Sequence, residues 1–170
     1  MALTGYVSGQ VIQSVPTRGV MKVDRFTASG TWTVPAGVTY AVAHIRGGGG
    51  GTGTSGSTGG AGGTSSVAFA SGTISATGGN LANQANGFAY NIVNVAGVAN
   101  SGNGAWRSGH SDPGVNAGGQ SVLAGDGAYV VAGADVTPAA SITVTVGDGG
   151  TAGSTGGAGG SGYVWIEYLA

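Results

Sequence analysis

The chain has 170 residues, of which 39 are glycine, five are basic, six are acidic and none is cysteine. The lack of cysteine excludes a disulfide scaffold, a cysteine-ligated metal site and a thiol nucleophile. A net charge of −1 without a basic run excludes the electrostatic footprint of a nucleic-acid-binding protein. Glycine makes up about 23% of the chain against a usual ~7%, and each glycine costs about 1 kcal/mol relative to alanine inside a helix. We therefore expect one domain that is poor in helix, with at most a small appendage.

The first 25 residues contain the least glycine and hold three of the five basic residues, Arg18, Lys22 and Arg25. They have neither the basic start nor the apolar stretch of a signal peptide, and no segment of the chain has the roughly 18 apolar residues of a membrane-spanning helix. Their valines predict short strands that are broken at Pro16 and Gly19. Two interpretations stay open: residues 1–25 are an attachment or oligomerisation arm, or they include the first strand of a main domain that spans 26–170.

From Phe26 onward, large and small residues alternate with the period of two that is typical of β-strands. In the segment 38–46, Val42 and His44 share one face, whereas Ala43 and Ile45 share the other. We expect the last strand, which is dense in large apolar side chains, to lie in the centre of a sheet. No window shows a helical period. The expected strands are 26–34, 38–46, 66–70, 73–77, 89–95, 128–132, 141–146 and 162–169.

Glycine recurs at every third position in two runs, each of which follows a predicted strand. The runs occupy positions 47, 50, 53, 56, 59 and 62, and positions 147, 150, 153, 156, 159 and 162. A period of three matches the polyproline II helix, which has no internal hydrogen bonds, and glycine lets neighbouring backbones approach closely. Such segments are either flexible linkers or packed helices that hydrogen-bond to one another, and we favour packing because the runs connect strands. The predicted fold is all-β: a β-sandwich with glycine-rich polyproline-II-like segments.

The motifs that carry chemistry are weak. The segment 51–56 matches the dinucleotide pattern G-x-G-x-x-G, but the glycines that follow it would not form the required helix. His44, in the middle of a predicted strand, is interpreted as a partly buried histidine with satisfied partners. His110 and Asp112 would offer only two metal ligands within one chain, although copies around a symmetry axis would supply six. Asp126 and Asp148 precede glycines and suit turns. We expect no catalytic residues, no cofactor, no metal and no enzymatic activity.

The segment 105–113 differs from its surroundings because it combines an aromatic ring, a cation, an imidazole and a carboxylate. Trp, Arg and Tyr are the residue types that dominate binding hot spots. We therefore place a recognition surface on the loops between about Asn80 and Asn116, outside the regular strand patterns, with four candidate residues. The alternative is that the tryptophan fills the core under a long loop. The four candidates are Tyr90, Trp106, Arg107 and His110.

Both ends of the glycine-rich region resemble a known family. The residues Gly-Thr-Trp-Thr-Val-Pro-Ala-Gly-Val-Thr at 30–39 lead into a strand and then a glycine block, and the chain closes with Gly-Tyr-Val-Trp-Ile-Glu-Tyr at 162–168. This pattern resembles the glycine-rich domain of tailed-phage tail-fibre and tail-tip proteins over residues 26–170. The resemblance is specific at both ends and weak between about 81 and 127. It implies a sandwich of polyglycine II helices whose variable loops contact a host receptor.

The resemblance and the composition together predict a phage tail-fibre or tail-tip protein that binds a receptor on the host cell, a protein or a polysaccharide, by surface contact. The alternative is a purely structural tail or capsid decoration or connector protein. A third class, a tip enzyme that cuts surface polysaccharide, would need two carboxylates roughly 5–10 Å apart. We expect a chain that is made in the host cytoplasm and located in the virion, in contact with other tail proteins. We also expect a homotrimer whose contacts include residues 1–25, since few surface charges oppose association.

Overall fold

The computed structural model describes residues 6–7, 10–11, 19–53, 59–83, 90–95, 100–102, 104, 106–110, 122–153 and 156–170. In these residues the regular structure is entirely β, and the structure includes no helix long and apolar enough to cross a membrane. The strands are β1 (Tyr6–Val7), β2 (Gln10–Val11), β3 (Met21–Phe26), β4 (Gly30–Thr33), β5 (Tyr40–Arg46), β6 (Thr52–Gly53), β7 (Ser65–Phe69), β8 (Gly72–Ala76), β9 (Ala82–Asn83), β10 (Tyr90–Val95), β11 (Trp106–His110), β12 (Val122–Leu123), β13 (Tyr129–Asp135), β14 (Ser141–Thr145) and β15 (Tyr163–Leu169).

Two antiparallel four-stranded sheets form the sandwich. Their strand orders are β13-β5-β15-β3 and β4-β14-β7-β8. The all-β sandwich predicted from the period-two pattern is therefore confirmed for the described residues. The expectation for the last strand is also confirmed, because β15 pairs with β5 on one side and with β3 on the other.

Alternation along each strand decides which side chains enter the core. On β5, Ala41, Ala43 and Ile45 are fully buried, whereas their neighbours Val42 and His44 face outward. β14 and β15 repeat this pattern with buried valines and isoleucines at every second position. The inner faces of both sheets thus form one hydrophobic core, which burial of apolar surface stabilises at about 25 cal/mol per Å².

An aspartate joins the two sheets. Asp24 on β3 accepts hydrogen bonds at Oδ2 from Trp32 Nε1 (2.8 Å) and from the Tyr168 hydroxyl (3.0 Å). Trp32 lies on the opposite sheet, and its ring lies 5.6 Å from that of Tyr168. Burial and the hydrogen bond to Asp24 raise the pKa of Tyr168 above its usual value. The sequence offered no reason to distinguish this carboxylate from the other acids.

The position of β3 agrees with the interpretation that the first 25 residues include the first strand of the main domain. Met21 to Phe26 pair with β15 as an edge strand of the sandwich, so residues 21–25 belong to the main sheet and not to a separate arm. β1 and β2 pair with each other in a two-stranded ribbon. The rest of residues 1–18 lies outside the described part of the chain.

Beyond the strands the chain continues into glycine segments that hydrogen-bond to one another with a period of three. The N–H groups of Gly48 and Gly51 donate to the carbonyl groups of residues 63 and 60. The N–H groups of residues 49 and 52 donate to residues 160 and 157, and those of residues 47 and 50 donate to residues 128 and 125. Successive residues of the central segment 47–52 therefore bind three different neighbours. This threefold arrangement is the packed alternative that the glycine triplets favoured, and we call it the glycine bundle.

Side chains have no room inside the glycine bundle. A Cβ on Gly50 would collide with the carbonyl oxygen of Asn80, and a Cβ on Gly159 would collide with that of Gly49. Most of the described glycines at the triplet positions meet a neighbouring backbone in the same way. The triplet period therefore reflects a requirement for contact between backbones.

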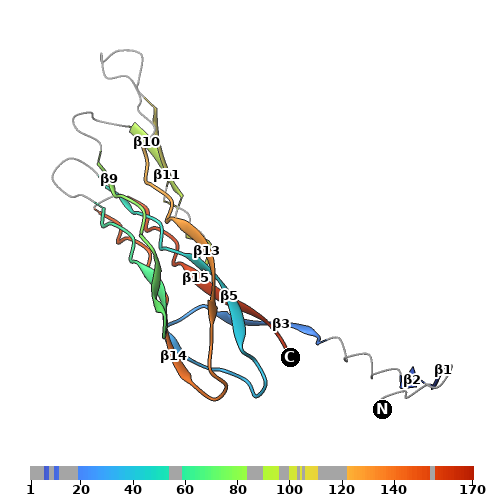
Figure 1. The fold of residues 1–170 in the computed structure, drawn as a ribbon. Helices are drawn as coiled ribbons and strands as arrows, with labels where there is room; N and C mark the ends of the chain where they lie inside the picture. Colours follow the sequence, from blue (N-terminus) through green and yellow to red (C-terminus); the bar gives the residue numbers. More distant parts are fainter. Residues whose placement is uncertain are drawn as a thin grey trace.

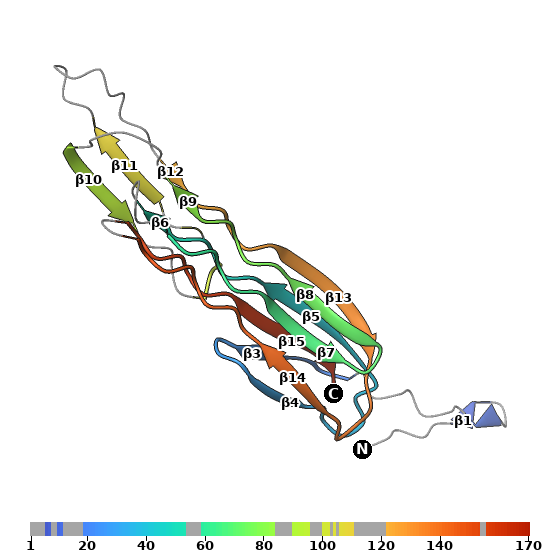
Figure 2. The same ribbon diagram turned by 90° about the vertical axis from the view of Figure 1, so that its left-hand side faces the viewer.

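The molecule is long, and its parts follow one another along its length. Figures 1 and 2 show the turn between β4 and β5 and the start of β14 at one end, the two sheets next, and the glycine bundle beyond them. The strands β10 and β11 lie at the other end. The glycine bundle is thus the link between the sandwich and this far end.

We predict that Asp24→Ala lowers the free energy of unfolding by about 2–4 kcal/mol, because it leaves a buried indole N–H and a buried phenol without an acceptor. Denaturant unfolding measures this change. Asp24→Asn, which keeps one acceptor oxygen, should cost less, and the exposed Asp135→Ala should change stability by less than about 0.5 kcal/mol. Equal losses for Asp24→Ala and Asp135→Ala would contradict the anchoring role.

We predict that Gly50→Ala destabilises the fold by about 3 kcal/mol or more, because the added methyl group forces two hydrogen-bonded backbones apart. The matched control is Gly30→Ala on β4, where a Cβ would meet only the Phe26 ring at 3.9 Å. Thermal unfolding monitored by circular dichroism compares the two variants. A Gly50 variant as stable as the Gly30 variant would show that the bundle tolerates side chains.

Candidate functional site

The four residues predicted to recognise a receptor lie on one antiparallel ribbon. β10 pairs with β11 so that Tyr90 is opposite His110, Trp106 is opposite Val95, and Arg107 is opposite residue 94. β11 also pairs with β12. Trp106 to His110, which we expected in a loop, therefore form a strand. The side chains of the four residues lie outside the part that the structure describes, as do residues 111–121, which include Asp112.

A second surface, which the sequence analysis missed, lies on the outer face of the sheet β13-β5-β15-β3. Register places Val131, His44, Trp165 and Arg25 in one row across the four strands. The Arg25 guanidinium lies 5.2 Å from the centre of the Trp165 ring, and the imidazole of His44 meets the same indole edge-on at 5.4 Å. Period two predicted which side chains share a face of each strand, but only the order of the strands brings these residues together.

His44 has partners on both ring nitrogens, as the interpretation of a satisfied histidine requires. Its Nδ1 is 2.7 Å from the Tyr129 hydroxyl, and its Nε2 is 3.4 Å from Glu167 Oε2. Partial burial of its phenol, together with the nearby Tyr163 and Glu167, raises the pKa of Tyr129 above its usual value. These contacts tie β5 to both of its neighbours, so they explain His44 as a structural residue of the sheet.

The outer faces of the two sheets differ sharply in chemistry. The face of β4-β14-β7-β8 carries mostly hydroxyl side chains, the usual choice for a solvated sheet face. The face of β13-β5-β15-β3 instead exposes large hydrophobic side chains to between 42% and 61%. The exposed hydroxyl residues of the first face are Thr31, Thr33, Thr73, Ser75, Ser141, Thr143 and Thr145. The exposed hydrophobic residues of the second are Met21, Val23, Tyr40, Tyr129, Val131 and Leu169.

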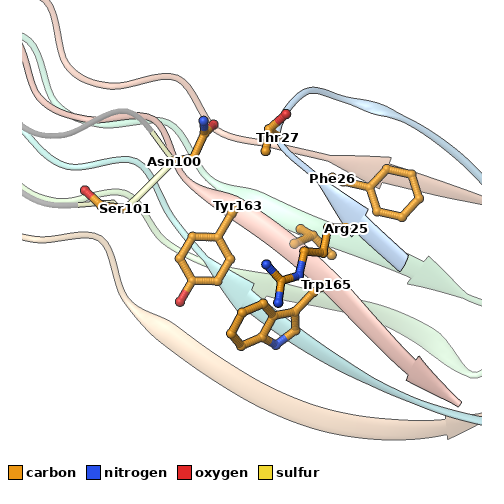
Figure 3. A pocket seen from close by; sticks show the side chains of 8 residues that line it. Arg25, Phe26, Thr27, Asn100, Ser101, Tyr163 and Trp165 are labelled. Carbon is orange, nitrogen blue, oxygen red and sulfur yellow. The ribbon is translucent and has the colours of Figure 1, made fainter. Parts of the chain in front are cut away.

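Two open grooves follow the hydrophobic outer face. The first, of about 440 Å³, lies where β3 ends and β15 begins, and Figure 3 shows its lining. The second, of about 390 Å³, lies at the other end of β15. The first is lined by Arg25, Phe26, Thr27, Asn100, Ser101, Tyr163, Val164 and Trp165. The second is lined by Met21, Gly37, Thr39, Tyr40, Val42, Glu167, Tyr168 and Leu169.

Three acidic side chains, those of Asp24, Asp126 and Glu167, contact other side chains of the fold. Asp126 pairs with Arg46 at 3.3 Å and accepts a hydrogen bond from the Gly104 N–H at 2.7 Å. It lies between two glycines whose N–H groups bond within the glycine bundle, and not in the predicted turn. Asp24 joins the sheets, and Glu167 pairs with His44. The residues that the structure describes include no cluster of three or more His, Asp or Glu side chains suited to hold a metal ion.

Comparison with protein-family models, with curated proteins and with solved structures finds no match. The candidate surfaces are therefore judged from their own geometry. Sequence signals existed for part of the outer face, since Tyr163 and Trp165 alternate within one strand. No signal along the chain could place Asn100 or Arg25 beside them, because they lie more than sixty residues away in sequence.

Proposed function

We propose that this chain is a tip module of a phage tail that binds a receptor on the host cell by surface contact. The observation that carries the proposal is the pairing of β10 with β11, which collects the four candidate residues on one ribbon. The ribbon lies at one end of the long body (Figure 2). The motifs of residues 26–46 and 142–168, which resemble the glycine-rich domain of tail-fibre proteins, supply the biological setting. Location in the virion follows from the same proposal.

The glycine bundle supports this role mechanically. Successive residues of its central segment 47–52 donate hydrogen bonds to three different neighbouring segments, which restrains bending of the backbone. Binding loses less free energy when the contact surface is already ordered. Recognition residues are also commonly carried by segments that a rigid scaffold positions. A bundle of this kind would hold the β10–β11 ribbon at a constant distance from the sandwich.

The second candidate function is a structural connector or decoration protein of the particle without receptor binding. The observation that favours it is the exposed hydrophobic face of β13-β5-β15-β3, because contiguous apolar surface commonly marks a protein–protein contact. The two functions differ in what they require of the ribbon. A receptor-binding module requires exposed aromatic and cationic side chains on β10 and β11, whereas a connector does not.

We also propose a homotrimer whose contacts include residues of the first 25. Three observations support self-association: Met21 and Val23 on the edge strand β3 are exposed, Leu169 beside them is exposed, and a groove lies between Met21 and Tyr40. Burying these side chains in a neighbouring copy would remove a large apolar area from water. The hydroxyl face of the other sheet would remain in solvent.

The double variant Trp106→Ala/Arg107→Ala tests the receptor-binding proposal. We expect it to fold and assemble normally and to reduce adsorption to host cells at least about tenfold, since Trp and Arg dominate contact energies. Adsorption assays with whole particles and thermal unfolding of the isolated chain give the two readouts. The control, Thr33→Ala/Thr143→Ala on the hydroxyl face, should adsorb normally. Normal adsorption by a folded Trp106/Arg107 variant would favour the connector, and failure to fold would make Trp106 a core residue.

The oligomeric state is tested by light scattering at micromolar concentration. We expect a mass three times the chain mass of 16.0 kDa for the unmodified protein, and a lower mass for Met21→Ser/Leu169→Ser because this change removes apolar contact area. Thr143→Ala on the other sheet should leave the mass unchanged. A monomeric mass for the unmodified chain would contradict the trimer.

A further inference from the structure

The groove between the end of β3 and the turn at residues 100–102 has features of a ligand site. β3 stops pairing with β15 at Val164, and the Gly102 N–H donates a hydrogen bond to the carbonyl of Ser161, shortly before β15 begins. Between these two points the chain leaves an open groove of about 440 Å³. That volume lies in the range of small-molecule sites, which are usually concave, partly aromatic and equipped with a few polar groups.

Arg25 is the charged group of the groove, and the aromatic residues hold it in place. Its guanidinium lies 5.2 Å from the centre of the Trp165 ring. The imidazole of His44 contacts the same indole edge-on. Figure 3 shows the guanidinium beside the indole, with Tyr163 next to them. A guanidinium that lies against an aromatic ring keeps its N–H groups at its edge, where they can bind an anion with two parallel hydrogen bonds.

The nearby acids do not neutralise Arg25. The ion pairs among the described residues join His44 with Glu167 and Arg46 with Asp126, and neither includes Arg25. Asp24, its neighbour in sequence, points to the other side of the sheet and binds Trp32. The cation on the groove wall is therefore available to a negative group of a ligand.

The rest of the lining suits a hydroxylated ring. Tyr163 presents an aromatic ring 5.4 Å from that of Trp165, and the apolar C–H face of a sugar can stack on such a ring. Asn100 adopts a left-handed backbone conformation (φ 57°) and is held by hydrogen bonds between its backbone N–H, its Oδ1 and the Ser161 hydroxyl. Asparagine tolerates the left-handed conformation better than most residues, so it suits this turn. Amide and hydroxyl groups from Asn100 and Thr27 are suited to hydrogen bonds with sugar hydroxyls.

We propose that this groove binds an anionic saccharide, with Arg25 pairing with its carboxylate or phosphate, Tyr163 stacking on its ring and Asn100 binding its hydroxyls. The inference goes beyond the proposed function, because the groove is lined by none of the four candidate receptor-binding residues. Figures 1 and 2 show the strands β10 and β11 at the far end of the molecule.

Isothermal titration calorimetry on the full chain tests the proposal with two matched pairs of ligands. Sialyllactose against lactose tests a carboxylate, and mannose phosphate against mannose tests a phosphate. We expect at least one anionic sugar to bind about tenfold or more tightly than its neutral partner, since hydrogen bonds to charged groups carry this much binding energy. Failure of both anionic sugars to bind better than their neutral partners would overturn the proposal.

Variants then assign the binding to the groove. Arg25→Ala should weaken binding of the preferred sugar about tenfold or more, and Tyr163→Ala should weaken both the anionic sugar and its neutral partner. The matched control is Lys22→Ala, an exposed cation on the same strand that does not line the groove. Trp106→Ala/Arg107→Ala should bind the sugar normally whether or not it adsorbs to cells, which separates this proposal from the proposed function. Equal binding by the Arg25 and Lys22 variants, each with a normal unfolding temperature, would overturn it.

Discussion

The close approach of glycine backbones in the bundle is the constraint on which the rest of the structure depends. Segments far apart in sequence, such as 47–53 and 156–160, share hydrogen bonds at a spacing that leaves no room for a Cβ. Because buried N–H and C=O groups need partners, the segments stabilise one another in the register that these hydrogen bonds define. The strands that enter and leave the bundle are positioned by that register, as are the sandwich at one end and the β10–β11 ribbon at the other.

The sandwich, unlike the glycine bundle, is stabilised by a core of apolar side chains. Its inner faces are apolar at every second position, and the Asp24 carboxylate accepts hydrogen bonds from Trp32 on one sheet and Tyr168 on the other. Among the few charged residues, Arg46 and Asp126 pair with each other, and Glu167 pairs with His44. Arg25 is different because it lies against an indole on the outer surface.

The outer faces of the two sheets differ in the kind of side chain that they present. One sheet presents hydroxyl groups that water solvates well, and the other presents aromatic and aliphatic side chains with two grooves between them. The far end carries the ribbon that holds the candidate receptor-binding residues. The turn at residues 100–102, which lines the first groove, also connects β10 to β11.

The sequence by itself determined the all-β class, most strands to within a few residues, the faces of β5 and β14, and the packing of the glycine triplets. It could do so because the periods of two and three are local properties of the backbone. The sequence also singled out Tyr90, Trp106, Arg107 and His110 by residue type, but wrongly expected the last three in a loop. Only the tertiary structure decided that residues 21–25 join the main sheet, that Asp24 bridges two sheets, and that Asn100 lies beside Tyr163. These facts depend on which strands become neighbours, and strand order is set by long-range pairing and core packing that no local pattern records.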